Sequence, residues 1–186
     1  GSLFAIIPHI KTKDVFLMTN HRTKSWIINA MVAALYIVLS LLVGILNLAS
    51  GAIQFRISEG LNHLVVFNKK YIWGITAGVL LFNAFGPGNS IPNVIFGTGQ
   101  TLLALLVVGY VSPRLPKMWQ KMALNTVLFT VSMCLVALEL KLTLNLPFWW
   151  TYFTTAVSEL IIMTITAPIM YYLDKVVHFN QRIEEK

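Results

Sequence analysis

Long apolar stretches separated by short polar loops run through most of this chain. Three of the stretches reach the roughly 20 residues that are needed to cross a hydrocarbon core, whereas 52–67 and 71–85 are shorter. A run that short is also compatible with a re-entrant or interfacial segment. The pattern as a whole predicts six helical spans, over residues 26–46, 52–67, 71–85, 94–111, 118–138 and 148–173.

The distribution of basic residues supports keeping both short spans. With the N-terminus placed inside, 12 of the 14 Lys and Arg residues fall on the inner side, and only Arg56 and Lys141 fall on the outer side. This bias satisfies the positive-inside rule. Removing either short span would invert the later loops and spoil the bias. We therefore predict six transmembrane helices with both termini in the cytoplasm.

Composition agrees with an all-α integral membrane protein. The 186 residues are 56% hydrophobic and 11% charged, and the mean hydropathy is +0.72, far from the composition of soluble domains. The positive-inside bias explains the net charge of +7, and no soluble basic face indicates a nucleic-acid binder. Cys134 is single and the histidines are scattered, so we expect no disulfide framework, metal site or cofactor.

The chain is expected to contain one folded domain. We predict a cytoplasmic N-terminal segment over residues 1–25, a six-helix membrane domain over 26–173 and a cytoplasmic tail over 174–186. Within the first segment, residues 1–17 begin with Gly-Ser and are compatible with a tag or another non-native extension.

Three polar residues, Gln54, Arg56 and Glu59, open the second predicted span at its outer end. Charges at membrane depth cost at least a few kcal/mol each, so they often mark a pathway or a ligand site. Arg56 and Glu59 are three positions apart on a helix, close enough to form an ion pair. Mutual neutralisation near the headgroups is therefore the structural alternative to a binding role.

Glu159 lies deeper in the predicted membrane than these residues. It follows Trp149 and its aromatic neighbours, taken as an interfacial belt, by about eight residues, which on a helix is on the order of 12 Å. The sixth span contains no basic partner for it. Glu159 must therefore face a polar cavity, pair with Arg56 across helices, or stay protonated. We favour the cavity.

Other polar residues at the outer side are ambiguous. Glu139 stands beside Lys141 at the end of the fifth span and can simply be hydrated. Asn83 and Asn93 bracket a Gly-Pro-rich loop over 86–93, where amides cap helices as readily as they line sites.

Together these groups favour a small, flat heterocycle as ligand. Carboxylates accept hydrogen bonds from N–H donors, and arginine and amide groups donate to a carbonyl or ring nitrogen. An aromatic side chain such as Phe55 or Trp149 can stack on the ring.

Two other classes of protein stay open: a self-sufficient carrier coupled to protons through Glu159, and an intramembrane enzyme that uses Glu139 with Glu159. Neither an internal repeat nor a nucleophile–base pair supports them.

At these residues the chain resembles a known family. The run Ile53-Gln54-Phe55-Arg56-Ile57-Ser58-Glu59-Gly60-Leu61 resembles the signature of the QueT family. Its members are substrate-binding membrane subunits (S components) of energy-coupling factor (ECF) transporters for queuosine precursors. The similarity extends from about residue 30 to 173, and includes Asn83-Ala84-Phe85-Gly86, Leu146-Pro147-Phe148-Trp149 and Ser158-Glu159-Leu160.

The resemblance implies an importer subunit of the bacterial plasma membrane with no enzymatic activity of its own. Such a subunit captures its ligand from outside in a pocket closed by the first and third loops. It docks on a transmembrane coupling subunit (EcfT) that carries two ATPase subunits, and ATP hydrolysis there reorients the whole subunit. Consistently, this chain has no phosphate-binding Gly-x-x-x-x-Gly-Lys-[Ser/Thr] loop. An Ala-x-x-x-Ala face serves for docking in the family, and Ala30, Ala33 and Ala34 match it.

The implied ligands are 7-deazaguanines: the cyano base (preQ0), the aminomethyl base (preQ1) or queuine. Glu59 or Glu159 would accept the paired N–H donors of the base, and the other could hold an aminomethyl cation. Asn93 replaces an acid that is usual in the family, which weakens the case for a cationic ligand, and Ser158 replaces a glycine. An S component for another vitamin or nucleobase is the nearest alternative. The predicted substrate-binding residues are Gln54, Phe55, Arg56, Glu59, Asn83, Asn93, Trp149 and Glu159.

Overall fold

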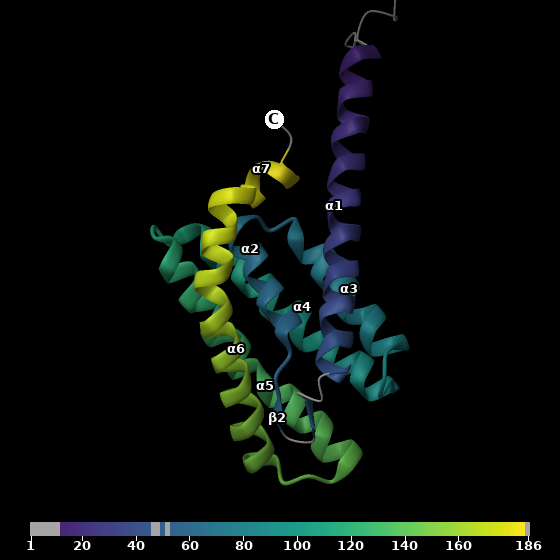
Figure 1. The fold of residues 1–186 in the computed structure, drawn as a ribbon, viewed down its shortest axis with the longest axis vertical. Coiled ribbons are helices and arrows are strands. Elements are labelled where there is room, and N and C mark those ends of the chain that lie inside the picture. Colours follow the sequence, from purple (N-terminus) through teal and green to yellow (C-terminus); the bar gives the residue numbers. More distant parts are fainter. Residues whose placement is uncertain (1–11, 46–48, 51–52, 185–186) are drawn as a thin grey trace, which may run out of the picture.

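A computed structural model of the chain describes residues 12–45, 49–50 and 53–184 (Figure 1). Among these described residues, four segments are long and apolar enough to cross a membrane: Arg22–Ile45, Asn93–Arg114, Met118–Leu144 and Phe148–Val177. Tyr71–Phe85 is a shorter apolar helix. The elements are α1 (Thr12–Ile45), β1 (Ala49–Ser50), β2 (Ile53–Gln54), η1 (Ile57–His63), α2 (Leu64–Phe67), α3 (Tyr71–Phe85), η2 (Asn93–Gly97), α4 (Thr98–Val111), η3 (Ser112–Arg114), α5 (Met118–Leu144), α6 (Phe148–Val177) and α7 (Phe179–Ile183).

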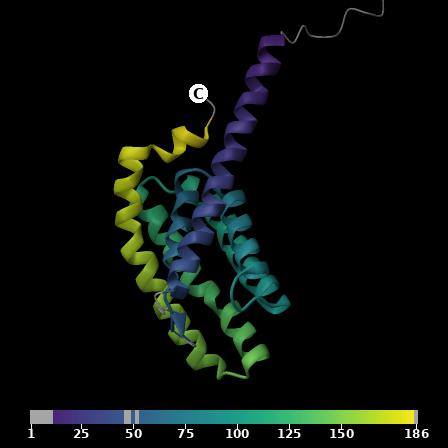
Figure 2. The same cartoon turned by 45° about the vertical axis from the view of Figure 1, so that its right-hand side comes forward.

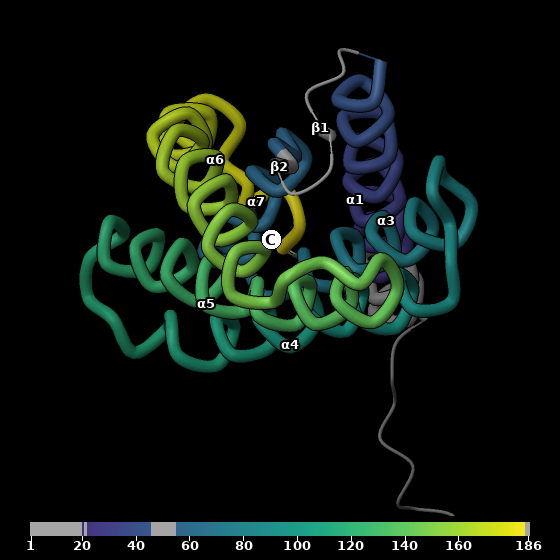
Figure 3. Tube along the Cα trace, turned by 90° about the horizontal axis from the view of Figure 1, so that it is seen from below, coloured from purple at the N-terminus to yellow at the C-terminus, as the bar shows by residue number. Residues whose placement is uncertain are grey.

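The described helices form an arc around η1 and α2. Seen along the bundle, α6, α5, α4, α3 and α1 follow one another around the second segment (Figure 3). The described start of α1, the α2–α3 connection and α7 lie toward one end, and the β1–β2 hairpin and the α5–α6 connection lie toward the other (Figure 1). The first turns of α1 project beyond the rest of the bundle (Figure 2). This arrangement agrees with a multi-pass membrane protein, while six complete crossings and cytoplasmic termini stay predictions.

The second segment differs from the helix predicted over 52–67. Ile53–Gln54 pairs with Ala49–Ser50 as an antiparallel hairpin, and Arg56 is extended, with φ −97° and ψ 95°. Only from Ile57 does the chain coil, first as the 3₁₀ helix η1 and then as the single turn α2. Every residue from 58 to 66 is buried. Because this segment lies inside the bundle and meets little lipid, it need not have the length of a spanning helix.

Glycines on α3 allow α1 to approach it closely. A Cβ atom at Gly74 would lie 2.7 Å from the Asn29 backbone oxygen, and one at Gly78 would lie 2.8 Å from the Tyr36 Cβ. Such distances exclude a larger side chain, so the Gly-x-x-x-Gly spacing of α3 permits tight helix packing. The Asn29 side chain uses this proximity to accept a hydrogen bond of 3.0 Å from the Gly74 backbone N–H.

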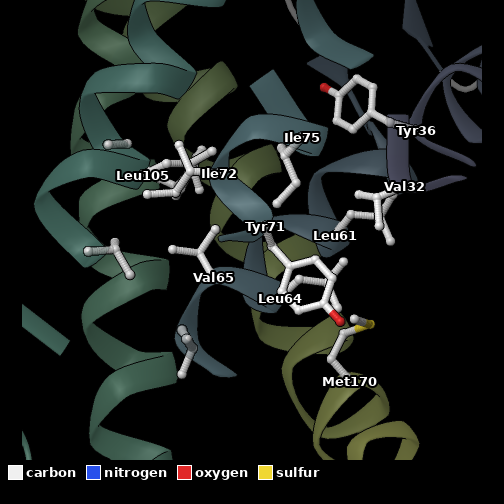
Figure 4. Close-up of a cluster of buried hydrophobic side chains, with 14 of the residues drawn as sticks. Val32, Tyr36, Leu61, Leu64, Val65, Tyr71, Ile72, Ile75, Leu105 and Met170 are labelled. Atoms are coloured by element: carbon white, nitrogen blue, oxygen red, sulfur yellow. The ribbon is translucent and has the colours of Figure 1, made fainter. Parts of the chain in front are cut away.

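The largest hydrophobic cluster joins the second segment to its neighbours. Leu61, Leu64 and Val65 pack with side chains of α1, α3, α4 and α6, including Tyr36, Ile75 and Leu105, which are at most 1% exposed (Figure 4). The cluster therefore fixes η1, which carries Glu59, inside the bundle.

Three helices are longer than predicted. α1 begins at Thr12 instead of residue 26, and two others extend at their C-terminal ends. α5 continues to Leu144 instead of 138 and α6 to Val177 instead of 173, and each ends before a residue in the left-handed conformation, Asn145 (φ 54°) and His178 (φ 56°). The last turns of α5 and α6 carry charged residues among apolar ones, namely Glu139 and Lys141, and Asp174 and Lys175, so they can lie outside the hydrocarbon core.

Candidate functional site

A polar cavity of about 430 Å³ lies between the 86–92 loop, the C-terminal half of α5 and Arg56. Arg56, Asn93 and Glu139 bring charged and amide groups to its lining, and Ser90 and Thr143 add hydroxyl groups. Val136, Leu140 and Leu144 supply an apolar wall. The mixture of a few polar groups with apolar surface is typical of small-molecule sites.

A narrow inner cavity continues from the same arginine toward α6. Arg56 and Val136 line both cavities, and Thr155, Met133 and Glu159 complete the inner one. Glu159 is only 4% exposed, and its Oε1 atom is buried with no hydrogen-bond partner among the described residues. An unpaired buried carboxyl oxygen costs about 1–3 kcal/mol, which a donor from a ligand would recover.

Arg56 is the electrostatic centre of the two cavities. Its extended backbone between β2 and η1 holds the half-buried side chain at their junction. The guanidinium interacts electrostatically with Glu139 and with Glu159, and Glu159 also interacts with Glu59. Several acidic groups therefore surround one arginine, and this excess of acceptors favours a ligand rich in N–H donors.

Glu59 is already satisfied by protein groups. The Tyr36 hydroxyl donates to Oε1 at 2.7 Å, and the Asn62 side chain donates to Oε2 at 2.6 Å. The expected ion pair between Arg56 and Glu59 is absent from the described residues, because Arg56 lies before the helix in extended conformation. The two residues contact each other through the backbone, where the Glu59 N–H donates to the Arg56 carbonyl at 2.9 Å. Within the described part of the chain, Glu59 bonds to α1 and to its own segment instead.

The other predicted site residues lie in different surroundings. Asn93 lines the outer cavity, and Phe55 is half-buried beside Arg56 in sequence. Asn83 is 1% exposed and donates to the Thr98 hydroxyl at 3.4 Å. It does not line the outer cavity itself, but it lies against Gly97, which does, since a Cβ atom at Gly97 would be 2.7 Å from Asn83 Nδ2. Trp149 is 77% exposed and packs edge-on against Phe148. Gln54 lies in β2, and its side chain lies outside the description.

Comparison with known proteins places this chain in a family. Residues 26–175 match the QueT transporter family. The queuosine precursor transporter QueT of Lactococcus lactis subsp. cremoris (strain MG1363) is 34% identical over 172 residues, which are 88% of this chain and all of that protein. The chain belongs to the QueT family. No solved structure matches it.

Membership in QueT confirms the resemblance found in the sequence. The matched region contains both cavities and every predicted span. A family of transporters, and not of enzymes, is also what we expected.

Among the described residues, no group of three His, Cys, Asp or Glu side chains is placed to hold a metal ion.

The structure adds residues to the site that the sequence did not single out. Glu139 was ambiguous, yet it is 8% exposed and lines the outer cavity with Asn93. Thr155 lines the inner cavity one helical turn before Glu159. Thr155 stands four residues before Glu159 on the same helix, and this spacing was the signal in the sequence that could have identified it. Tyr36 offered no such signal, because its contact with Glu59 joins distant parts of the chain.

The three alanines of the predicted docking face separate into two environments. Ala30 and Ala34 are exposed. Ala33 is 7% exposed and lies against α3, where a Cβ at Gly78 would be 3.0 Å from its backbone oxygen. Ala33 therefore takes part in packing within this chain, and Ala30 with Ala34 present the accessible pair.

Proposed function

We propose that this QueT family member is the substrate-binding S component of an ECF importer in a bacterial plasma membrane, and that its ligand is a 7-deazaguanine precursor of queuosine. The unpaired, buried Oε1 of Glu159 beside Arg56 carries the proposal. The name of the Lactococcus relative, a queuosine precursor transporter, supports this class of substrate.

Glu159, and not Glu59, is the proposed acceptor for the guanine-like edge of the ligand. Both oxygens of Glu59 already accept hydrogen bonds from Tyr36 and Asn62. The cavity that Glu159 shares with Arg56 holds only about 10 Å³, so the base would have to widen it on binding. The free oxygen of Glu159 would then accept one of the neighbouring N–H groups of the base, and the guanidinium would donate to the ring carbonyl. The carboxyl group thus accepts from the N–H donors of the ring, and the guanidinium donates to its carbonyl oxygen.

Glu139 gives the site a second acidic group at its outer side. It lines the same cavity as Asn93, the position where the resemblance implies an acid, so a carboxylate is present in this region on a different helix. We infer that the aminomethyl base is the preferred ligand, with its ammonium group near Glu139. A cyano group has no charge for this carboxylate to stabilise.

Transport itself is proposed to need partner proteins. The ligand would be captured at the hairpin end of the bundle, and docking on a coupling subunit through the exposed Ala30 and Ala34 would follow. Small residues at that face would let a partner helix approach closely. Reorientation driven by two partner ATPases would then release the ligand inside.

Uptake by reconstituted vesicles tests the proposal. The chain alone and the chain with its coupling subunit and two ATPase subunits are compared for uptake of radiolabelled aminomethyl base with ATP inside or outside. We expect uptake only with the partners and with ATP on the side of the ATPases. Equal uptake by the chain alone would show a self-sufficient carrier, and the absence of any bound deazaguanine would contradict the substrate assignment.

A further inference from the structure

A second cavity, of about 500 Å³, lies between α1 and α3 and is separate from the proposed ligand site. Its surface is mostly apolar and carries several polar and charged side chains. Its lining residues are Arg22, Ser25, Trp26, Asn29, Lys70 and Trp73. None of them lines either of the cavities around Arg56. Lys70 belongs to the α2–α3 connection, so this cavity opens near the end of the molecule that holds α7 (Figure 1).

The polar lining of this cavity consists of hydrogen-bond donors without an acidic residue. Arg22 and Lys70 each bring a positive charge, and Ser25 brings a hydroxyl group. Asn29 is 8% exposed, and its Oδ1 accepts the Gly74 backbone N–H at 3.0 Å. Among the described residues Nδ2 has no hydrogen-bond partner, which leaves one donor on a side chain that lines this cavity. Such a set of groups is suited to an anion.

The indoles indicate where this cavity lies relative to the bilayer. Trp26 is 73% exposed and Trp73 is 69% exposed, on neighbouring helices. Tryptophan is enriched at the headgroup level of membrane proteins, where its ring meets lipid and its N–H meets water. The cationic groups therefore lie at the depth of lipid phosphates, and acyl chains lie beside the apolar faces of α1 and α3.

We propose that this cavity binds the phosphate of an anionic phospholipid, with phosphatidylglycerol as the model ligand. Arg22 and Lys70 contact the phosphate, Asn29 Nδ2 donates to one of its oxygens, and Trp26 and Trp73 flank the glycerol and the upper acyl chains. Basic pockets between membrane helices recognise anionic headgroups in this way. The proposal does not depend on what the cavities around Arg56 bind.

Native mass spectrometry of the full chain, released from nanodiscs with equal amounts of phosphatidylglycerol and phosphatidylcholine, tests this site. We expect wild type to retain phosphatidylglycerol in preference to phosphatidylcholine. The double variant Arg22→Gln/Lys70→Gln should lose affinity on the order of fivefold for each cation removed, or about thirtyfold together. The charge-conserving variant Arg22→Lys/Lys70→Arg should keep the preference.

The control variant Arg114→Gln/Lys117→Gln removes the same charge outside this cavity. Arg114 and Lys117 lie on the α4–α5 connection, and neither lines the proposed lipid cavity. The connection is still near Lys70, because its Ser112 and Pro113 line another cavity together with Lys70. Equal loss of phosphatidylglycerol in both double variants would overturn the proposal, because general charge would then explain retention. Displacement of the lipid by millimolar inorganic phosphate would overturn the proposal in favour of a site for free anions. Coverage of Arg22 and Lys70 by a coupling subunit in the absence of lipid would overturn it in favour of a protein-binding surface.

Discussion

The Tyr36 hydroxyl lies 2.7 Å from Glu59 Oε1 and donates a hydrogen bond that joins α1 to η1. The two residues are 23 positions apart, and both are at most 3% exposed. Asn62 occupies the other oxygen of the same carboxyl group. Glu59 therefore holds the segment after the hairpin in place, which in turn positions Arg56.

Loss of the Tyr36 hydroxyl should lower stability. In Tyr36→Phe a buried carboxyl oxygen loses its donor, and we expect a loss of about 1–3 kcal/mol in the free energy of unfolding. Thermal unfolding of the purified protein in detergent measures the effect. Tyr110→Phe, at a tyrosine that is 67% exposed, is the matched control. Equal midpoints for the two variants would show that the buried bond contributes nothing.

A methyl group at Gly74 should separate α1 from α3. It would lie 2.7 Å from the Asn29 backbone oxygen, which cannot move without moving α1. We expect Gly74→Ala to cost about 1–3 kcal/mol of stability. Gly99→Ala is the control, since a Cβ there meets no atom within 4 Å and alanine favours helix by about 1 kcal/mol. A Gly74→Ala variant as stable as Gly99→Ala would contradict the close packing.

Charge at Glu139 should decide between related ligands. Because this carboxylate lines the outer cavity, Glu139→Gln is expected to weaken binding of the aminomethyl base roughly tenfold, which corresponds to about 1.4 kcal/mol. Binding of the neutral cyano base should change little. Isothermal calorimetry with both ligands measures the difference, and Glu184→Gln, at an exposed residue, controls for net charge. Parallel losses for the two ligands would remove Glu139 from the recognition of the cation.

Bulk on the exposed face of α1 should affect assembly and leave ligand binding intact. Ala30 and Ala34 are exposed and one helical turn apart. Replacing both by leucine would hold a partner helix away, so we expect co-purification with the coupling subunit to fall at least roughly tenfold. Ala123→Leu, at an exposed alanine of α5, serves as the control. Normal assembly of the Ala30→Leu/Ala34→Leu variant would place the docking surface elsewhere.

The sequence predicted the long helices well and the second segment poorly. Apolar length and charge bias identify α1, α4, α5 and α6, because lipid imposes the same demand on every residue of a spanning helix. Residues 53–58 alternate apolar and polar side chains, which is typical of an extended strand and was overlooked within a short apolar run. The hairpin and the extended Arg56 follow from this alternation.

Candidate site residues were predictable individually but not as contacts. Glu159 and Arg56 attracted attention as costly charges in an apolar chain, and the structure brings both to one cavity. The partners of Glu59 could not be foreseen, since Tyr36 belongs to a different helix and only the packing of α1 on η1 brings its hydroxyl within reach. Trp149 was chosen as an aromatic wall, yet it lies on the exposed side of α6.

Binding of the aminomethyl base to wild type and to Glu159→Gln tests the central claim most directly. Glu159 Oε1 is buried and unpaired among the described residues, so the variant should fold at least as stably as wild type while its affinity falls about a hundredfold, or roughly 2.7 kcal/mol. Calorimetry gives the affinity, and thermal unfolding without ligand gives the stability. A Glu159→Gln variant that binds the base as tightly as wild type would contradict the account.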